Sequence, residues 1–210
     1  MKLYDMRQAP NPRRVRIFLA EKGIEIPFEE VDIQAGENLA PWYLSINPRG
    51  VVPTLLLEDG RMLDESIAIC RYIEGLHPEP NLFGGSAWEA ADVERWQRRM
   101  EFDGMFNVGA AFRNTAHAYA QRGAPGAGPP TPAIPAMAER GQLLARQWLD
   151  RLEERLAGRE FIACDRFTIA DITAFVSLDF AKWVGIRAGV AHANVAAYHA
   201  RIKARPSSTA

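Results

Sequence analysis

The stretch at residues 47–66 constrains the fold of this chain more strongly than any other. Pro53 comes directly before an apolar run at residues 54–57. Because proline cannot donate a ladder hydrogen bond, it belongs at the first residue of such a strand. Asp59-Gly60 is typical of a two-residue hairpin turn, and Met62-Leu63 begins the returning strand. We therefore predict an antiparallel hairpin headed by Pro53.

A helix follows this hairpin, and its start resembles a binding site for a carboxylate. The run Asp64-Glu65-Ser66 offers capping groups. The apolar positions of the helix are Ile69, Cys70, Ile73 and Leu76. Free N–H groups at a helix N-terminus attract a carboxylate. The backbone of Val52, just before the proline, is free to pair with an extended peptide. These features predict a site for a small peptide with a free carboxylate.

The residues before the hairpin predict a strand, a helix and a second strand. Lys2-Leu3-Tyr4 opens the first strand, and Asn11 is expected to cap a helix that ends at Gly23. Residues 26–33 form the second strand, which should pair parallel to the first through a right-handed crossover. A short amphipathic piece at residues 39–46 comes next. The first 76 residues are thus predicted to form a thioredoxin-like βαβαββα domain.

The rest of the chain reads as helical. A Pro-rich break marks a linker at 77–86, and 87–210 is predicted to be an all-helical domain, which makes the fold class α/β plus all-α. One long helix from residue 87 to about 120 should be kinked or broken near Gly104 and Gly109. The Gly- and Pro-rich residues 121–135 cannot be regular structure. They form either a mobile surface loop or a lid at the edge of a substrate pocket.

Thr168 and Asp171 have the spacing of a capping box, with Asp in place of the usual Glu or Gln. We interpret this motif as structural and expect no chemistry from it. Loss of the cap in Asp171→Ala should cost about 1–2 kcal/mol of stability.

Composition excludes several classes of function. The chain is 48% hydrophobic and 24% charged with a net charge of −1, which is typical of a globular protein without a nucleic-acid or membrane partner. No apolar run approaches the roughly 20 residues that span a bilayer. Cys70 and Cys164 match no metal or redox spacing, so no metal site is predicted. The absence of a signal peptide favours the cytoplasm.

The order and spacing of these motifs resemble the glutathione S-transferase family, in particular its bacterial theta- and beta-like members, over nearly the whole chain. The resemblance implies that Pro53 is cis and that Val52 pairs with the cysteinyl backbone of glutathione. It also implies that Glu65 and Ser66 hold the γ-glutamyl end.

The family stabilises the glutathione thiolate with a donor near the first helix, and this chain departs from the usual motif. Ala9 falls where theta-type members have Ser, and Pro12 falls where other members have Cys. Three donors remain: the Asn11 side chain, Tyr4, and the backbone N–H groups of the first helical turn. We favour Asn11 together with the backbone; the alternative is that Asn11 is a plain cap.

The resemblance implies further contacts. Asn38 falls near the glycyl end of glutathione. Asp103 either reaches across a dimer to the amino group of glutathione or is a solvated helix acid. Phe106, Phe112 and Arg113 lie where the family binds the electrophile, although packing accounts for the aromatic residues equally well.

The function predicted from the resemblance is that of a cytoplasmic, homodimeric glutathione S-transferase active in detoxification. Its co-substrate is glutathione, and it conjugates the thiolate to a hydrophobic electrophile. Two alternatives stay open. One is a glutathione-binding or protein-interaction module without turnover, and the other is a specialised isomerase, dehalogenase or ether-cleaving lyase. The sequence does not identify the electrophile.

Overall fold

The computed structural model describes all 210 residues, and the chain divides into two compact units. The first unit holds Met1–Pro80 together with Ala124–Thr131 and Ala210, and the second holds Asn81–Gly123 and Pro132–Thr209. The boundary after Pro80 falls inside the segment expected as a linker. The short segment Ala124–Thr131, which the sequence placed in the helical half, belongs instead to the first unit.

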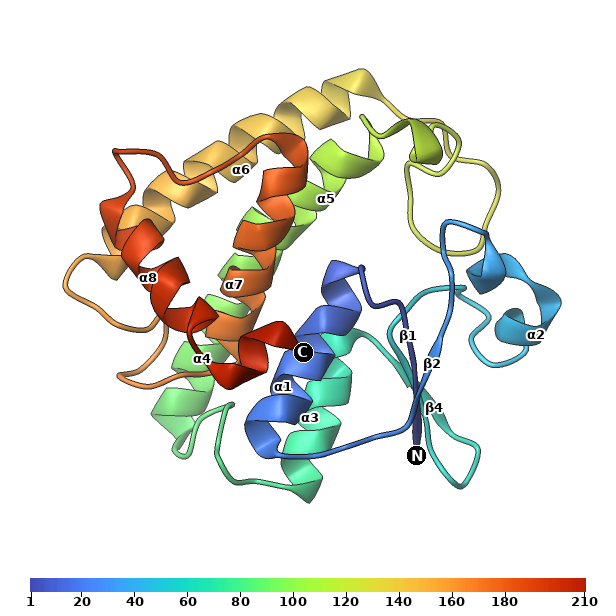
Figure 1. The fold of residues 1–210 in the computed structure, drawn as a ribbon, viewed down its shortest axis with the longest axis horizontal. Coiled ribbons are helices and arrows are strands. Elements are labelled where there is room, and N and C mark those ends of the chain that lie inside the picture. The colour runs from blue at the N-terminus through green and yellow to red at the C-terminus, as the bar shows by residue number, and fades with distance from the viewer. The chain divides into compact units, whose positions relative to one another are not determined.

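The first unit has the predicted βαβαββα order. Its elements are β1 (Lys2–Asp5), α1 (Pro10–Lys22), β2 (Phe28–Glu30), α2 (Pro41–Leu44), β3 (Thr54–Leu56), β4 (Met62–Asp64) and α3 (Ser66–Leu76). The sheet order is β2-β1-β3-β4, with β1 parallel to β2 and the other pairs antiparallel. Helices α1 and α3 lie side by side on one face of the sheet, and α2 lies on the other side (Figure 1).

The register of the sheet determines what meets at its edges. Thr54 at the start of β3 pairs with Tyr4 near the end of β1 and with Asp64 at the end of β4. The carboxyl ends of β1 and β4 therefore lie beside the amino end of β3. At this one edge of the sheet, the chain leaves β1 towards α1, leaves β4 towards α3, and enters β3. These three connections carry predicted site residues.

One local prediction in this unit, the start of α1, was wrong. Helix α1 begins at Pro10 with Ala9 as its N-cap, so Asn11 lies in the first turn rather than at the cap. Proline suits the first helical position because its missing N–H has no intrahelical partner there. Of the apolar positions named on α3, Ile69, Cys70 and Ile73 are buried, whereas Leu76, at the end of the helix, is 49% exposed.

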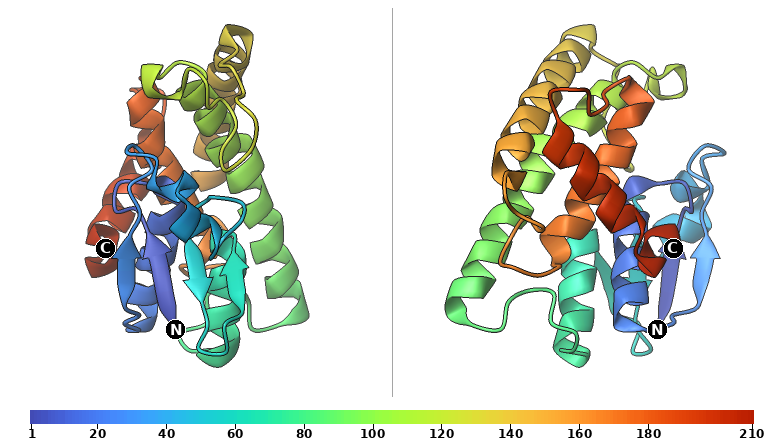
Figure 2. Two further views of the ribbon diagram at one scale, coloured as in Figure 1. Left: turned by 90° about the vertical axis from the view of Figure 1, so that its right-hand side faces the viewer. Right: turned by 60° about the vertical axis from the view of Figure 1, so that its left-hand side comes forward.

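The second unit is helical. It contains α4 (Ala87–Arg99), a π-helical turn (Met100–Met105), α5 (Phe106–Arg113), α6 (Pro135–Leu156), α7 (Ile169–Ala181) and α8 (Ala193–Lys203). Helix α5 packs along α6, and α7 runs through the middle, nearly all of it buried (Figure 2). No helix of the structure is both long enough and apolar enough to cross a membrane.

The predicted long helix is interrupted at Gly104, which lies in the π-helical turn. A Cβ atom there would come within 2.7 Å of the Trp148 ring, so the close packing requires glycine. The helix stops at Arg113 instead of reaching residue 120. Asn114 ends it, because its side chain donates to the Ala110 carbonyl and accepts from the Ile134 N–H.

Asp171 does more than cap a helix. Its carboxylate is fully buried and accepts hydrogen bonds from the N–H and hydroxyl of Thr168, from the N–H of Ile162 and from the hydroxyl of Tyr198. Burial raises the pKa of Asp171 to about 6. The residue therefore joins the start of α7 to the preceding loop and to α8.

This network changes the expected cost of Asp171→Ala. The substitution leaves at least three buried donors without a partner, so we expect a loss of about 3–5 kcal/mol in the free energy of unfolding rather than the loss of a cap alone. Denaturant unfolding at pH 7 measures it. Asp165→Ala, an exposed acid in the same loop, is the control and should change little. A loss below about 2 kcal/mol would mean that only the cap contributes.

Candidate active site

The candidate site is built on the sheet edge where β1 and β4 end and β3 begins. From this edge the chain runs into α1, which carries Asn11 in its first turn, and into α3, which begins at Ser66. Val52 and Pro53 enter β3 at the same edge. The topology thus brings together the heads of two helices and the proline-headed strand.

The Val52-Pro53 peptide bond is cis, as expected. The carbonyl just before it, on Val51, accepts hydrogen bonds from the Tyr43 hydroxyl at 2.6 Å, Asn47 Nδ2 at 3.2 Å and Thr54 Oγ1 at 3.0 Å. The three donor side chains are fully buried. Neither the N–H nor the C=O of Val52 makes a hydrogen bond within the chain, so both are available to an extended peptide.

Sequence reasoning missed the three side chains that fix Val51. Asn47 and Thr54 flank the proline motif, and Thr54, a polar residue in the predicted buried run at residues 54–57, was an available signal. For Tyr43 the sequence predicts only a place in the amphipathic piece at residues 39–46. Burial raises the pKa of its hydroxyl to about 12, so the hydroxyl remains a donor at any ordinary pH.

Glu65 has a backbone conformation that is rare for a residue with a side chain. Its φ is 66°, in the left-handed region, and its carbonyl accepts the N–H of Ile69. Such positions are maintained only where the surroundings enforce them, and they cluster at binding sites. The Glu65 side chain is largely exposed and pairs with Arg49 Nη1 at 2.8 Å, which also lies 3.3 Å from Asp64.

The predicted capping of α3 by residues 64–66 was wrong. Glu65 is the N-cap, but its side chain makes no capping bond because the carboxylate is paired with Arg49. The N–H groups of Ser66, Ile67 and Ala68 have no partner within the chain. They form the kind of anion-binding helix terminus that the γ-glutamyl carboxylate would require.

The first turn of α1 has few free hydrogen-bond donors, and those it has belong to Asn11. Pro10 and Pro12 have no N–H, and the Arg13 N–H bonds to the Ala9 carbonyl. Asn11 therefore holds the one unpaired backbone N–H of this turn. Its Oδ1 accepts from Arg14 at 2.9 Å. Since a guanidinium only donates, this bond orients the amide so that Nδ2 is left to donate elsewhere.

The connection between β1 and α1 is held rigidly. Arg16 donates to both oxygens of the buried Asp5 carboxylate, at 2.5 and 2.7 Å, and to the Arg7 carbonyl at 2.6 Å. Burial raises the pKa of Asp5 despite this partner. The bonds fix the path of the backbone that leads to Asn11.

Asn38 is almost completely buried, and its Nδ2 donates to the Gly50 carbonyl at 2.7 Å. The structure therefore gives the side chain an internal partner on the turn that precedes Val51. The contact with the glycyl end of glutathione stays a prediction.

The other predicted residues lie in the second unit. Asp103 is paired with Arg151 at 3.5 Å and is partly exposed. Arg113 lies over the Tyr119 ring, and burial lowers its pKa. Phe106 is 66% exposed, whereas Phe112 packs in an aromatic cluster. The rings around Phe112 are those of Tyr119, Phe180 and Trp183.

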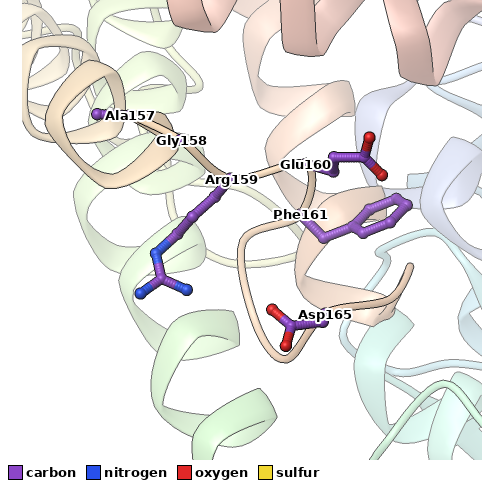
Figure 3. A pocket seen from close by; sticks show the side chains of 6 residues that line it. All are labelled: Ala157, Gly158, Arg159, Glu160, Phe161 and Asp165. Atoms are coloured by element: carbon purple, nitrogen blue, oxygen red, sulfur yellow. The ribbon is translucent and has the colours of Figure 1, made fainter.

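A pocket of about 370 Å³ opens in the loop between α6 and α7. Its lining consists of Ala157, Gly158, Arg159, Glu160, Phe161 and Asp165. Figure 3 shows Glu160 and Asp165 on either side of the Phe161 ring and Arg159 extending away from it. None of the predicted glutathione or electrophile residues lines this pocket. We therefore do not assign it to the candidate active site.

A thioredoxin-like unit with a cis-proline beside an open helix head, followed by a helical unit, is the architecture of the glutathione-dependent transferases. Residues 9–76 match the family model of the glutathione S-transferase N-terminal domain, and residues 127–206 match that of the C-terminal domain. The chain belongs to the glutathione S-transferase family, whose co-substrate is glutathione.

Individual relatives agree with this assignment. Glutathione S-transferase 2 of Saccharomyces cerevisiae is 30% identical over 99% of this chain and 87% of its own length. The crystal structure of a glutathione S-transferase domain-containing protein from Marinobacter aquaeolei superposes with a TM-score of 0.90 at 36% identity, covering 99% of both chains. Maleylacetoacetate isomerase of Pseudomonas aeruginosa is 40% identical over 84 residues, which are 39% of this chain and 40% of the isomerase.

The strained backbone of Glu65 gives a test of the site. Glu65→Gly removes the Cβ that disfavours positive φ, so stability should be unchanged or higher, while affinity for glutathione should fall at least about tenfold. Thermal unfolding and calorimetric titration with glutathione measure the two effects. Glu65→Gln keeps the Cβ and the length but not the charge. It should lose affinity without a gain in stability; unchanged affinity in both variants would remove Glu65 from the site.

Proposed function

We propose that this chain binds glutathione along the Val52 backbone, with the γ-glutamyl end at Glu65 and Ser66, and conjugates its thiolate to a hydrophobic electrophile. The observation that supports this most strongly is the sheet register, which gathers Asn11, Val52 and the head of α3 at one edge. The backbone groups left unpaired there match an extended peptide with a terminal carboxylate.

The thiolate is stabilised by Asn11 rather than by a hydroxyl or a thiol. Ala9 and Pro12 carry no donor, and the two prolines leave the Asn11 N–H as the one unpaired backbone donor of the turn. Its Nδ2, oriented by Arg14, is the second donor. Two hydrogen bonds at a helix N-terminus favour the charged form of a thiol and lower its pKa.

The electrophile is held by the second unit. The aromatic cluster around Phe112 provides an apolar wall, and Arg113 adds a positive charge that suits an aromatic or acidic acceptor. A specialised isomerase is the second candidate, which the match of 84 residues to maleylacetoacetate isomerase favours. A screen of electrophiles and of cis-unsaturated diketo acids separates the two reactions.

The protein works as a homodimer in the cytoplasm, where it serves in detoxification. Phe102 and Phe106 are 60% and 66% exposed, and they lie one turn apart on either side of Asp103. Exposed aromatic rings so placed are typical of an interface. Asp103 would then face the partner subunit, where an acid can reach the amino group of glutathione. Both cysteines are unpaired, which suits a reducing compartment.

Asn11→Asp tests the thiolate donor, because it keeps the shape but replaces an N–H donor by a negative charge. We expect kcat/KM with a standard aromatic electrophile to fall about 100-fold and the pKa of bound glutathione, read from thiolate absorbance against pH, to rise by at least one unit. The fall in Asn11→Ala should be smaller, since this change removes the side-chain donor without adding a negative charge beside the thiolate. If turnover and the thiol pKa in both variants equal those of the wild type, the Asn11 side chain has no role in stabilising the thiolate. If the wild type binds glutathione but does not turn over, a non-catalytic module is favoured.

The interface is tested by Phe106→Ser. Loss of a central aromatic contact should convert the dimer to monomer at micromolar concentration in analytical ultracentrifugation. Val190→Ser, at a fully exposed position, is the matched control and should remain dimeric. A monomeric wild type would exclude the dimer outright.

A further inference from the structure

The turn at residues 47–50 leads into the cis-proline, and backbone atoms of other segments pack closely against it. The N–H of Gly50 bonds to the Asn47 carbonyl, and the N–H of Arg49 bonds to Asn47 Oδ1. Gly50 has a φ of 60°, and a Cβ there would lie 2.8 Å from the Asn38 carbonyl and 3.2 Å from the nitrogen of Ala127. The turn is therefore packed backbone against backbone on both sides.

One of these neighbours comes from far along the sequence. The N–H of Ala127 donates to the Arg49 carbonyl at 2.7 Å. Gly126 has a φ of 87°, and a Cβ on it would lie 2.5 Å from the Arg49 carbonyl oxygen and 3.1 Å from the Val51 side chain. We call Gly126 and Ala127 the docked pair. They explain why Ala124–Thr131 belongs to the first unit.

Arg49 connects the docked pair to the ligand site. Its carbonyl is held by Ala127, while its guanidinium holds the carboxylate of Glu65 at 2.8 Å. The next residue but one, Val51, carries the carbonyl on which Tyr43 and the other buried donors converge. A shift of the docked pair would therefore move both the backbone at the start of β3 and the Glu65 carboxylate beside the start of α3.

We propose that the docked pair is a positioning element of the glutathione site, which sets the Arg49–Glu65 ion pair so that Glu65 meets the amino group of glutathione. This inference rests on the proposed function. The Gly/Pro-rich segment is exposed along most of its length, as a surface loop would be, but the docked pair anchors it to the turn.

The test compares Gly126→Ala with Gly128→Ala. A Cβ at Gly126 collides with backbone, whereas a Cβ at Gly128, two residues along the same segment, meets nothing within 4 Å. We expect Gly126→Ala to raise the KM for glutathione and its Kd by calorimetry about 5- to 20-fold, with kcat at saturating glutathione within about twofold, because positioning of the ground-state ligand is what is lost. Gly128→Ala should match the wild type in all three.

A second pair of variants keeps the proposal falsifiable if Gly126→Ala folds poorly. Arg49→Ala should raise the KM for glutathione about 3- to 10-fold, and Arg49→Lys should restore part of it. Arg61→Ala removes a similarly exposed ion pair, with Asp59, and should have no effect. With a glutathione analogue that lacks the γ-glutamyl amino group, the wild type and Arg49→Ala should bind equally, because Glu65 then has no ligand partner.

The outcomes separate this inference from the function itself. If the wild type fails to bind glutathione, both the proposed function and the positioning role of the docked pair are overturned. If the wild type binds and turns over but Gly126→Ala and Arg49→Ala do so equally well, only the positioning role is overturned. The same result follows if the two variants lose as much affinity for the analogue as for glutathione, since the defect would then not act through Glu65.

Discussion

The carbonyl of Val51 is the group on which the site depends. A buried carbonyl without a partner costs about 1–3 kcal/mol, and the cis-proline two residues later has no N–H to help satisfy the strand entry. Three buried side chains converge on this oxygen from the amphipathic piece, the turn and β3. Because they fix Val51, the backbone of Val52 enters the sheet in one orientation, and β3 then sets the register of both β1 and β4.

Much of this fold could be predicted because its signals are local. The hairpin, the parallel strands and the apolar face of α3 follow from short patterns, whereas the cis state of Pro53 was implied only by the family resemblance. The start of α1 was misplaced because Pro10 and Pro12 both suit the first helical position, and the N-cap preference for Asn over Ala favoured the wrong one. The cost of losing Asp171 was underestimated because Tyr198 and Ile162, which complete its bonding, lie outside the motif.

The roles of the predicted site residues stay predictions, and the residues that support them were less well anticipated. Glu65 was expected to cap α3, yet Arg49 competes successfully for its carboxylate, and no rule of helix capping anticipates a partner from another turn. The docking of Ala127 on Arg49 has no side-chain signature at all. Its trace in the sequence is a pair of glycines far apart, Gly50 and Gly126, and in a segment already rich in glycine such positions do not stand out.

The pattern of satisfied and unsatisfied groups distinguishes the site from the rest of the first unit. Below the sheet edge the polar groups are paired: Asp5 with Arg16, Asn38 with Gly50, and the Val51 carbonyl three times over. At the edge itself, the N–H of Asn11, both amide groups of Val52 and the N–H groups that begin α3 have no internal partner. Water can pair these groups. A ligand that pairs all of them at once needs an extended backbone, a carboxylate at one end, and a hydrogen-bond acceptor near the start of α1. The supporting residues thus fix the positions of the groups that the fold leaves unpaired, and those groups suit the extended peptide of the proposed function.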